Sequence, residues 1–314
     1  VKGDKIFSSR PRAHMCGMMF ECIYPVCSGA TLYYLGKTPT ASVLLSSLQE
    51  IKPIQLLTVP LVMEKVYKSS IKPVVSKPII TVLMKIIPGF KALICGKIHD
   101  KLLTAFGGNL RTIIMGGAPL NPEAEDWFKA CKLPYTVGYG MTECAPLISY
   151  RIWNEYVPKS CGVPVPGADV RIDSADPEHE VGEIQITGCK SGDLGIMDKN
   201  GNLFIKGRSK NMILAANGQN VYPEELEAIV NNQPYVLESV VISRESRIVA
   251  LVYLDEKALK DAGMDAEAVD AYIPQLMATV NKQLPSYSKI VAVEVRDTPF
   301  EKTPKMSIKR FMYK

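Results

Sequence analysis

Short apolar runs alternate with helical patterns along the first 150 residues of the chain. A short apolar run closed by Gly or Pro is typical of a buried strand, and apolar residues spaced three and four apart predict a helix. The predicted strands are Ala30–Leu35, Ile54–Val59, Leu110–Met115 and Tyr135–Tyr139, and the predicted helices are Val43–Ile51, Leu61–Ser69 and Pro122–Cys131. Strands and helices that alternate in this way indicate a parallel sheet covered by helices. We therefore expect an α/β fold.

The pattern changes twice further along the chain. From about residue 162 to 206, Gly and Pro separate three short strands, Val170–Ile172, Glu183–Thr187 and Leu203–Ile205, which predict a small antiparallel or barrel-like unit.

Beyond residue 208, two helices and two strands alternate again over about a hundred residues, which predicts a small α+β domain. The helices are Pro223–Asn231 and Val269–Lys282, and the strands are Val236–Ser243 and Ile248–Leu254. We expect one domain over residues 1–208, with the small β unit at about 162–206, and a second domain over residues 209–314.

Composition narrows the class of protein. The 314 residues are 47% hydrophobic and 22% charged, which excludes a disordered chain. The eight cysteines contain no Cys-x-x-Cys pair and there are only three histidines, so a structural zinc site is not expected. Reduced thiols in a cytoplasmic protein are the interpretation we favour. The best apolar stretch, Pro78–Cys95, is interrupted by Lys85 and Lys91, so we expect no membrane span.

The net charge of +5 is unevenly distributed. Nine Lys or Arg residues and one acid, Asp100, lie between Lys65 and Arg111, together with many apolar residues. A basic and apolar segment can form a membrane-surface patch, which here implies peripheral contact with the inner face of a membrane. A core helix with a solvated lysine face explains the same pattern. Nucleic acid is not expected as a partner, because the aromatic residues are not interleaved with the basic ones.

The residues that carry chemistry follow the predicted strand Tyr135–Tyr139. Gly138 and Gly140 allow a sharp turn and close backbone approach. Thr142 and Glu143 then present a hydroxyl and a carboxylate, which together can hold a phosphate oxygen and a hard cation such as Mg²⁺. A turn capped by Thr142 is the structural alternative.

Resemblance decides between these interpretations. Tyr139-Gly-Met-Thr-Glu143 resembles the signature of the adenylate-forming superfamily, which includes acyl-CoA synthetases, luciferases and nonribosomal-peptide adenylation domains. Gly116-Gly-Ala-Pro-Leu120 resembles the adenine-binding loop of that family. Further family elements follow in the family's order, at 182–184, 192–195, 203–210 and 217–225. The text around His14–Gly17 and Glu21–Pro25 is most similar to bacterial long-chain fatty-acid CoA ligases.

The resemblance implies the later part of a large adenylate-forming domain and a small mobile C-terminal domain. It implies a long-chain fatty acid–CoA ligase that uses ATP, Mg²⁺, coenzyme A and a fatty acid, and forms an acyl-adenylate before the thioester. The alternatives are a catalytically impaired relative that binds nucleotide or lipid on the same scaffold, and an adenylating enzyme for a different carboxylic acid.

The resemblance also assigns site residues. Thr142, Glu143 and Lys210 are the expected catalytic residues, Glu143 the metal ligand and Lys210 the hinge of the C-terminal domain. The expected nucleotide-binding residues are Gly116, Gly117, Ala118, Pro119, Tyr139, Gly140, Met141, Thr142, Asp193 and Arg208, and the expected acyl or CoA residues are His14, Gly17 and Gly218. Tyr139 would stack on the purine, and Asp193 and Arg208 would contact the ribose. A surface ion pair is the alternative for Asp193 and Arg208, and a simple turn glycine is the alternative for Gly218.

The chain departs from the family pattern at several places. The Ser/Thr/Gly-rich phosphate loop is absent from these 314 residues, so we expect a C-terminal part of a longer ligase that is inactive alone. The family's longer loop is missing between Lys190 and Ser191, which predicts either a deletion or a break in the chain. Ser307 stands where the family has a lysine that stabilises the adenylation transition state, and Lys305 could replace it. Arg10 and Arg12 stand where the family prefers apolar residues.

Overall fold

The structure is a computed structural model, and it describes residues 3–8, 14–35, 41–215, 217–245, 247–303 and 307–313. These residues form two compact units. The first comprises Val1–Arg171, Ile186–Gly188 and Met197–Phe204, and the second comprises Ile172–Gln185, Cys189–Ile196 and Ile205–Lys314.

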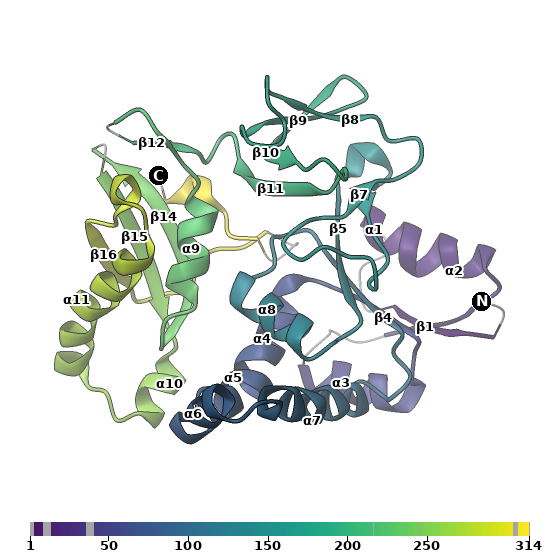
Figure 1. Ribbon diagram of the computed structural model, residues 1–314, viewed down its shortest axis with the longest axis horizontal. Helices are drawn as coiled ribbons and strands as arrows, with labels where there is room; N and C mark the ends of the chain where they lie inside the picture. The colour runs from purple at the N-terminus through teal and green to yellow at the C-terminus, as the bar shows by residue number, and fades with distance from the viewer. Residues whose placement is uncertain are drawn as a thin grey trace. The chain divides into compact units, whose positions relative to one another are not determined.

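A seven-stranded sheet organises the first unit (Figure 1). Its strands are β1 (Lys5–Ser8), β2 (Thr31–Tyr34), β3 (Gln55–Thr58), β4 (Thr112–Gly116), β5 (Tyr135–Gly140), β6 (Leu147–Tyr150) and β7 (Val163–Pro164). They lie in the order β2-β1-β3-β4-β5-β6-β7. Strands β1 to β5 pair in parallel, and β6 and β7 extend the sheet antiparallel from β5. The expected α/β fold with a parallel sheet is confirmed.

Several helices of this unit begin where the sequence offers a fixed φ or a cap. Pro60, Pro78 and Pro122 each occupy the first turn of their helix, where a missing N–H costs nothing. Asn121 caps the last of these by accepting hydrogen bonds from the N–H groups of Glu123 and Ala124. The helices are α1 (Met15–Met18), η1 (Met19–Ile23), α2 (Tyr24–Cys27), α3 (Ala41–Ile51), α4 (Pro60–Val66), η2 (Tyr67–Ile71), α5 (Lys72–Val75), α6 (Pro78–Ile86), α7 (Phe90–Ala105) and α8 (Pro122–Ala130).

Aromatic side chains hold α8 against the sheet. The ring of the fully buried Phe128 packs edge-on against Tyr67 and Tyr135, with centroids 6.5 and 5.9 Å apart. The buried carboxylate of Glu125 accepts hydrogen bonds from Tyr135 and Tyr156 and from the N–H of Lys159. Burial raises the pKa of Glu125, and these three donors act in the opposite direction. The start of β5 is therefore fixed by a packed and hydrogen-bonded layer.

Four strands follow along the chain: β8 (Val170–Asp173), β9 (Gly182–Ile186), β10 (Cys189–Met197) and β11 (Leu203–Arg208). They form one sheet in the order β11-β10-β9-β8, and β7 belongs to the larger sheet. Strand β10 passes through Lys190 and Ser191 without interruption, so the predicted chain break is wrong. The short connection between the two motifs is a property of this chain.

The second unit contains a three-stranded sheet with helices on one face. Its strands are β14 (Val236–Arg244), β15 (Arg247–Leu254) and β16 (Ala292–Arg296), and β15 pairs antiparallel with β14 and parallel with β16. Alternate β15 residues face opposite ways: Ala250 and Val252 pack with the helices, and Val249 and Leu251 pack with Phe300. The remaining elements are the hairpin β12 (Ile213–Leu214) and β13 (Asn220–Val221), the helices α9 (Pro223–Asn231), α10 (Glu256–Asp261) and α11 (Ala266–Gln283), and the 3₁₀ turns η4 (Ser286–Ser288) and η5 (Arg310–Met312).

Two further observations bear on the sequence predictions. All eight cysteines are free thiols in this structure. Across the part of the chain that the structure describes, no helix combines the length and the apolar character that crossing a membrane requires.

Candidate functional site

The carboxyl ends of β4 and β5 bring two of the sequence motifs together. The strands pair in parallel with Gly116 opposite Gly138, and a Cβ on Gly116 would lie 3.1 Å from the Gly138 carbonyl oxygen. Beyond β4 the chain turns at Gly117, whose φ of +91° favours glycine, and Gly117 to Pro119 are exposed. In open α/β sheets, ligands bind outside the carboxyl ends of the strands. The predicted adenine loop therefore lies at the edge where a ligand site is expected.

The turn that follows β5 depends on Gly140. A Cβ on this residue would lie 1.9 Å from the carbonyl oxygen of Pro146, so no other residue lets β5 and β6 close in this way. The chain then forms a short 3₁₀ turn, η3 (Thr142–Cys144). Met141 is its N-cap residue and makes no side-chain capping bond, so the structure does not have the turn capped by Thr142.

Thr142 and Glu143 are both exposed at this edge. Within the described ranges, neither side chain has a hydrogen-bond or ion-pair partner. Two polar side chains without a structural task beside an exposed glycine loop are available to a ligand. Tyr139 differs from them, since it is only 8% exposed and presents little of its ring to solvent.

The donor set suits a magnesium ion that is shared with a nucleotide. Carboxylate and hydroxyl oxygens are the hard ligands that Mg²⁺ prefers, and Mg²⁺ keeps several waters and substrate phosphate oxygens around one or two protein ligands. Glu143 provides such a carboxylate. The described residues contain no cluster of three or more His, Cys, Asp or Glu side chains that could hold a metal by themselves. The residues fit a metal held jointly with phosphate and do not fit a protein-only metal centre.

His14 and Gly17 lie at the start of α1. The Nδ1 atom of His14 accepts a hydrogen bond from the N–H of Cys16 at 3.2 Å and so caps this helix, and Gly17 is buried within it. The structure thus gives His14 a local structural task, and the predicted contact with the acyl group or CoA stays a prediction.

Asp193 and Arg208 meet in the second unit. Asp193 lies on β10 and is 6% exposed, and Arg208 ends β11. The Oδ1 atom of Asp193 lies 2.7 Å from Nε of Arg208, and the Arg208 side chain is 63% exposed. The two residues predicted to contact the ribose are therefore neighbours. They form an ion pair with each other, which was the alternative interpretation of both residues. Most of the guanidinium side chain is still open to solvent.

Lys210 and Gly218 follow in the same unit. Lys210 is exposed in the turn after β11, and together with Arg310 it lines a pocket of about 190 Å³. Gly218 has a φ of +81° in the turn between β12 and β13, where a Cβ would meet no atom within 4 Å. The backbone conformation, rather than close packing, requires glycine at this position. The turn-glycine alternative is what the structure describes, and passage of a thiol arm stays a prediction.

The two described ends of the C-terminal signature lie close together, and each end contacts a glutamate. Lys302 and Ile308 make an antiparallel bridge, and Ser307 lies exposed beyond it. Lys302 pairs with Glu238, and Arg310 donates to Oε1 of Glu227. Lys305, Arg10 and Arg12 lie outside the described residues.

Sequence reasoning missed Glu227 and Glu238. Both acids pair with basic residues of the C-terminal signature more than sixty positions away. The cations Lys302 and Arg310 were a signal that partners exist, but only the fold identifies them.

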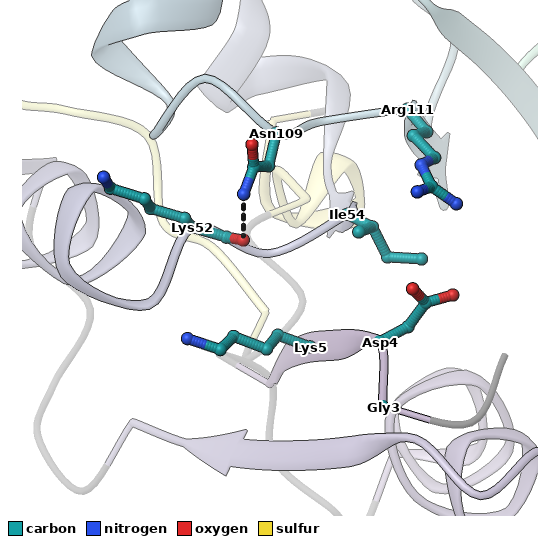
Figure 2. A pocket seen from close by; sticks show the side chains of 7 residues that line it. All are labelled: Gly3, Asp4, Lys5, Lys52, Ile54, Asn109 and Arg111. Atoms are coloured by element: carbon teal, nitrogen blue, oxygen red, sulfur yellow. Dashed lines mark hydrogen bonds between the residues drawn. The ribbon is translucent and has the colours of Figure 1, made fainter.

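A pocket of about 370 Å³ lies at the opposite end of the strands of the large sheet. Figure 2 shows Lys5, Lys52, Asn109 and Arg111 around it, with the Asn109 amide donating to the Lys52 carbonyl. Its residues come directly before or at the start of β1, β3 and β4, so they mark the amino ends of the strands. This pocket is separate from the edge that carries Thr142 and Glu143.

Comparison with known proteins agrees with the motifs. The family model of AMP-binding enzymes matches residues 1–193, and the model of the AMP-binding enzyme C-terminal domain matches residues 210–313. The chain is 28% identical over 250 residues to the long-chain-fatty-acid–CoA ligase FadD15 of Mycobacterium bovis, covering 68% of this chain and 42% of that protein. It is 27% identical over 291 residues to long-chain-fatty-acid–CoA ligase 1 of Saccharomyces cerevisiae, covering 78% of this chain and 41% of that protein.

A solved structure shares the fold at lower identity. The o-succinylbenzoate coenzyme A synthetase of Bacillus subtilis, in complex with ATP and magnesium ion, superposes with a TM-score of 0.71 at 19% identity, over 98% of this chain and 61% of that chain. The chain thus spans about two fifths of the length of these curated relatives. The match of the AMP-binding model to more than half of the residues shows that this chain belongs to the family of AMP-binding, adenylate-forming enzymes.

Proposed function

We propose that this chain is part of an AMP-forming long-chain fatty acid–CoA ligase. The observation that carries the proposal is the edge formed by β4 and β5, where the exposed Gly117–Pro119 loop lies beside Thr142 and Glu143. In this proposal, family membership gives the edge its chemistry, because these residues resemble the family's nucleotide motifs. The 314 residues contain no phosphate loop, so the proposal concerns the longer protein, and the chain alone is proposed to be inactive.

The proposed reaction has two steps. In the first, a carboxylate oxygen of the acid attacks the α-phosphorus of ATP, the bond from that phosphorus to the bridging oxygen breaks, and pyrophosphate leaves. In the second, the thiol of CoA gives up its proton to solvent, its sulfur attacks the acyl carbonyl carbon, the bond to the AMP oxygen breaks, and AMP leaves. Activation is needed because thioester formation from a free carboxylate is uphill.

The described residues would contribute binding and charge. The Gly116–Gly117 backbone admits a purine, the Thr142 hydroxyl binds a phosphate oxygen, and the Glu143 carboxylate would hold Mg²⁺, which neutralises phosphate charge when bound. Asp193 would accept hydrogen bonds from the ribose hydroxyls, as carboxylates do in other nucleotide sites. Arg208 would orient Asp193 through their ion pair. Lys210 would serve as the hinge between the two steps.

The acid is proposed from the curated relatives. Those reported above are named long-chain-fatty-acid–CoA ligases, and the structural neighbour is named for o-succinylbenzoate. Sequence similarity at 27–28% supports the fatty acid more than a shared fold does.

The test is thioester formation by the full-length protein with ATP, CoA and a panel of acids. We expect acyl-CoA to form from palmitate and oleate. The kcat/KM for benzoate and o-succinylbenzoate should be at least about tenfold lower, because a long chain contributes apolar binding energy that a short acid lacks. Equal or greater activity with the aromatic acids would contradict the fatty-acid assignment and leave the ligase assignment standing.

One observation favours a second candidate, a non-catalytic binding protein on the same scaffold. Ser307 provides no cation where the family has a lysine. This candidate predicts that ATP and fatty acid bind to the full-length protein but that no pyrophosphate is released with any acid in the panel.

A further inference from the structure

Helix α6 presents an apolar surface that no other described element covers. Seven of its nine residues are large and apolar or proline, yet none is buried. A helix that is apolar on all sides is ordinarily enclosed by protein or lipid. Its inner side, with Ile80, Leu83 and Met84, is half-buried. The outer side is unusual because its apolar side chains are exposed to solvent.

The outer side is one continuous face. Ile79, Val82 and Ile86 are spaced three and four apart, which places them on the same side of the helix. They are 73%, 50% and 69% exposed. Ile87 directly after the helix and Leu93 on the adjoining helix α7 are also exposed, at 45% and 56%. A packed core would not leave five large aliphatic side chains of two adjoining helices in water.

Exposed lysines accompany this face. Lys77 immediately precedes α6 and Lys85 lies within it, and both are exposed. Lys91, at the start of α7, lies over the ring of Trp127 at 5.2 Å from its centroid, so it belongs to the contact between α7 and α8. Lys97 follows Leu93 by one helical turn and Lys101 follows Lys97, both exposed. The single acid of the segment is Asp100. Figure 1 shows α6 and α7 as consecutive dark-blue helices, and the two helices contact each other.

We propose that the outer face of α6, with Leu93 of α7, inserts into the interfacial region of an anionic lipid bilayer. Apolar side chains at helical spacing with lysines at their flanks are what an interfacial helix uses, the first for the acyl boundary and the second for the headgroups. The charge complementarity favours lipid over a second copy of this chain, which would bring two lysine sets together. A fatty acid released within a bilayer would reach such a protein directly, but the membrane contact does not depend on the proposed reaction.

The experiment uses the full-length protein and vesicles of phosphatidylcholine, with and without phosphatidylglycerol. We expect sedimentation with the anionic vesicles only, weakened severalfold between about 0.05 and 0.3 M salt because the lysine contribution is screened. The variant with Ile79→Ser, Val82→Ser and Ile86→Ser should lose at least about tenfold in affinity, since each isoleucine contributes roughly that much when inserted. Its target positions are exposed, so the fold should be retained, which circular dichroism checks.

The matched control changes three exposed apolar residues elsewhere, Leu214→Ser, Leu237→Ser and Val291→Ser. This control should bind as the unchanged protein does. Equal binding to neutral and anionic vesicles, or equal loss in both triple variants, would overturn the proposal.

A photo-crosslinking amino acid at position 86 distinguishes the remaining occupants. We expect crosslinks to lipid when anionic vesicles are present. Crosslinks within the protein's own chain, both with and without vesicles, would overturn the proposal. Crosslinks to a second copy, in a dimer that the serine variant dissociates, would overturn it as well.

Discussion

The Oδ1 atom of Asp193 lies 2.7 Å from Nε of Arg208, and this contact joins the ends of two family motifs. Asp193 is buried and Arg208 is mostly exposed, so the pair holds a carboxylate in a fixed orientation beside a cation that solvent still reaches. Such an arrangement suits a ribose, whose hydroxyls are hydrogen-bond donors to the carboxylate.

Asp193→Asn should therefore weaken nucleotide binding more than it weakens the fold. Hydrogen bonds to a charged group are stronger than hydrogen bonds to a neutral group. Replacing the carboxylate by an amide should therefore raise the KM for ATP by about tenfold or more. The control is Lys206→Gln on the neighbouring strand β11, which breaks the ion pair with Glu225 at 3.2 Å. Equal effects of the two variants on KM would show that Asp193 has only a structural role.

Glu143 offers a sharper separation of function from stability. Its side chain is exposed and has no partner among the described residues, so Glu143→Gln should shift the melting temperature by no more than about 1 °C. The same change should lower the rate of adenylate formation on the order of a hundredfold and raise the Mg²⁺ concentration needed, because a metal ligand is lost. The control is Glu155→Gln, another exposed glutamate, which pairs with the exposed Arg151. This change should alter neither the rate of adenylate formation nor the Mg²⁺ dependence. An unchanged Mg²⁺ dependence would remove Glu143 from the metal site.

Ser307 tests the origin of transition-state charge stabilisation. Adenylation builds negative charge around the α-phosphorus, and an ammonium group meets that charge more strongly than a hydroxyl does. Ser307→Lys in the full-length protein should speed pyrophosphate release on the order of a hundredfold and leave thioester formation from supplied acyl-adenylate unchanged. Rapid release with Ser307 that falls on Lys305→Ala would assign the role to Lys305. Equal effects on both steps would show that position 307 acts structurally.

Glu227 should make the stability of the second unit depend on pH. Burial raises the pKa of this carboxyl to about 8, while Arg310 and the N–H of Val241 act to lower it and Glu224 acts to raise it further. An unfolded glutamate titrates near 4.3, so between these two values the folded state holds a proton that the unfolded state has lost. The stabilisation is therefore fully present below about pH 4.3 and disappears as the pH rises through 8.

The stability of the second unit is measured by digesting the full-length protein with a protease at increasing urea concentrations, at pH 6 and at pH 9. The readout is the appearance of peptides from α9. We expect lower stability at pH 9 in the unchanged protein and a smaller difference in Glu227→Gln, which keeps a neutral acceptor for Arg310. Glu301→Gln, which breaks the exposed pair with Lys309, should leave the pH dependence as it was. A pH dependence that survives Glu227→Gln would assign it to another group.

Much of the fold could be predicted because local pattern and tertiary environment agree. The predicted strand at 54–59 became β3, which is buried at every position although it contains Gln55 and Thr58, and Pro122 with its acidic first turn began α8 as predicted. Sequence pattern did not predict β6, β7 or β16, because such short strands are defined by the partners they pair with.

The site residues divide in the same way. Gly116, Gly140, Thr142 and Glu143 are adjacent to turns that the sequence makes obligatory, so their placement at one edge could be predicted from strand order. The pairing of Arg310 with Glu227 could not, since it joins segments 83 positions apart. The bounds of the domains, the cytoplasmic location and the roles of individual site residues stay predictions.

The central claim, that a carboxylate is activated by attack on the α-phosphorus of ATP, has a direct test. The full-length protein is given palmitate labelled with ¹⁸O in both carboxyl oxygens, together with ATP, Mg²⁺ and CoA, and the products are weighed by mass spectrometry. The account predicts one ¹⁸O atom in each AMP and none in pyrophosphate. Label in inorganic phosphate together with ADP would contradict it, because the acid would then have attacked the terminal phosphorus.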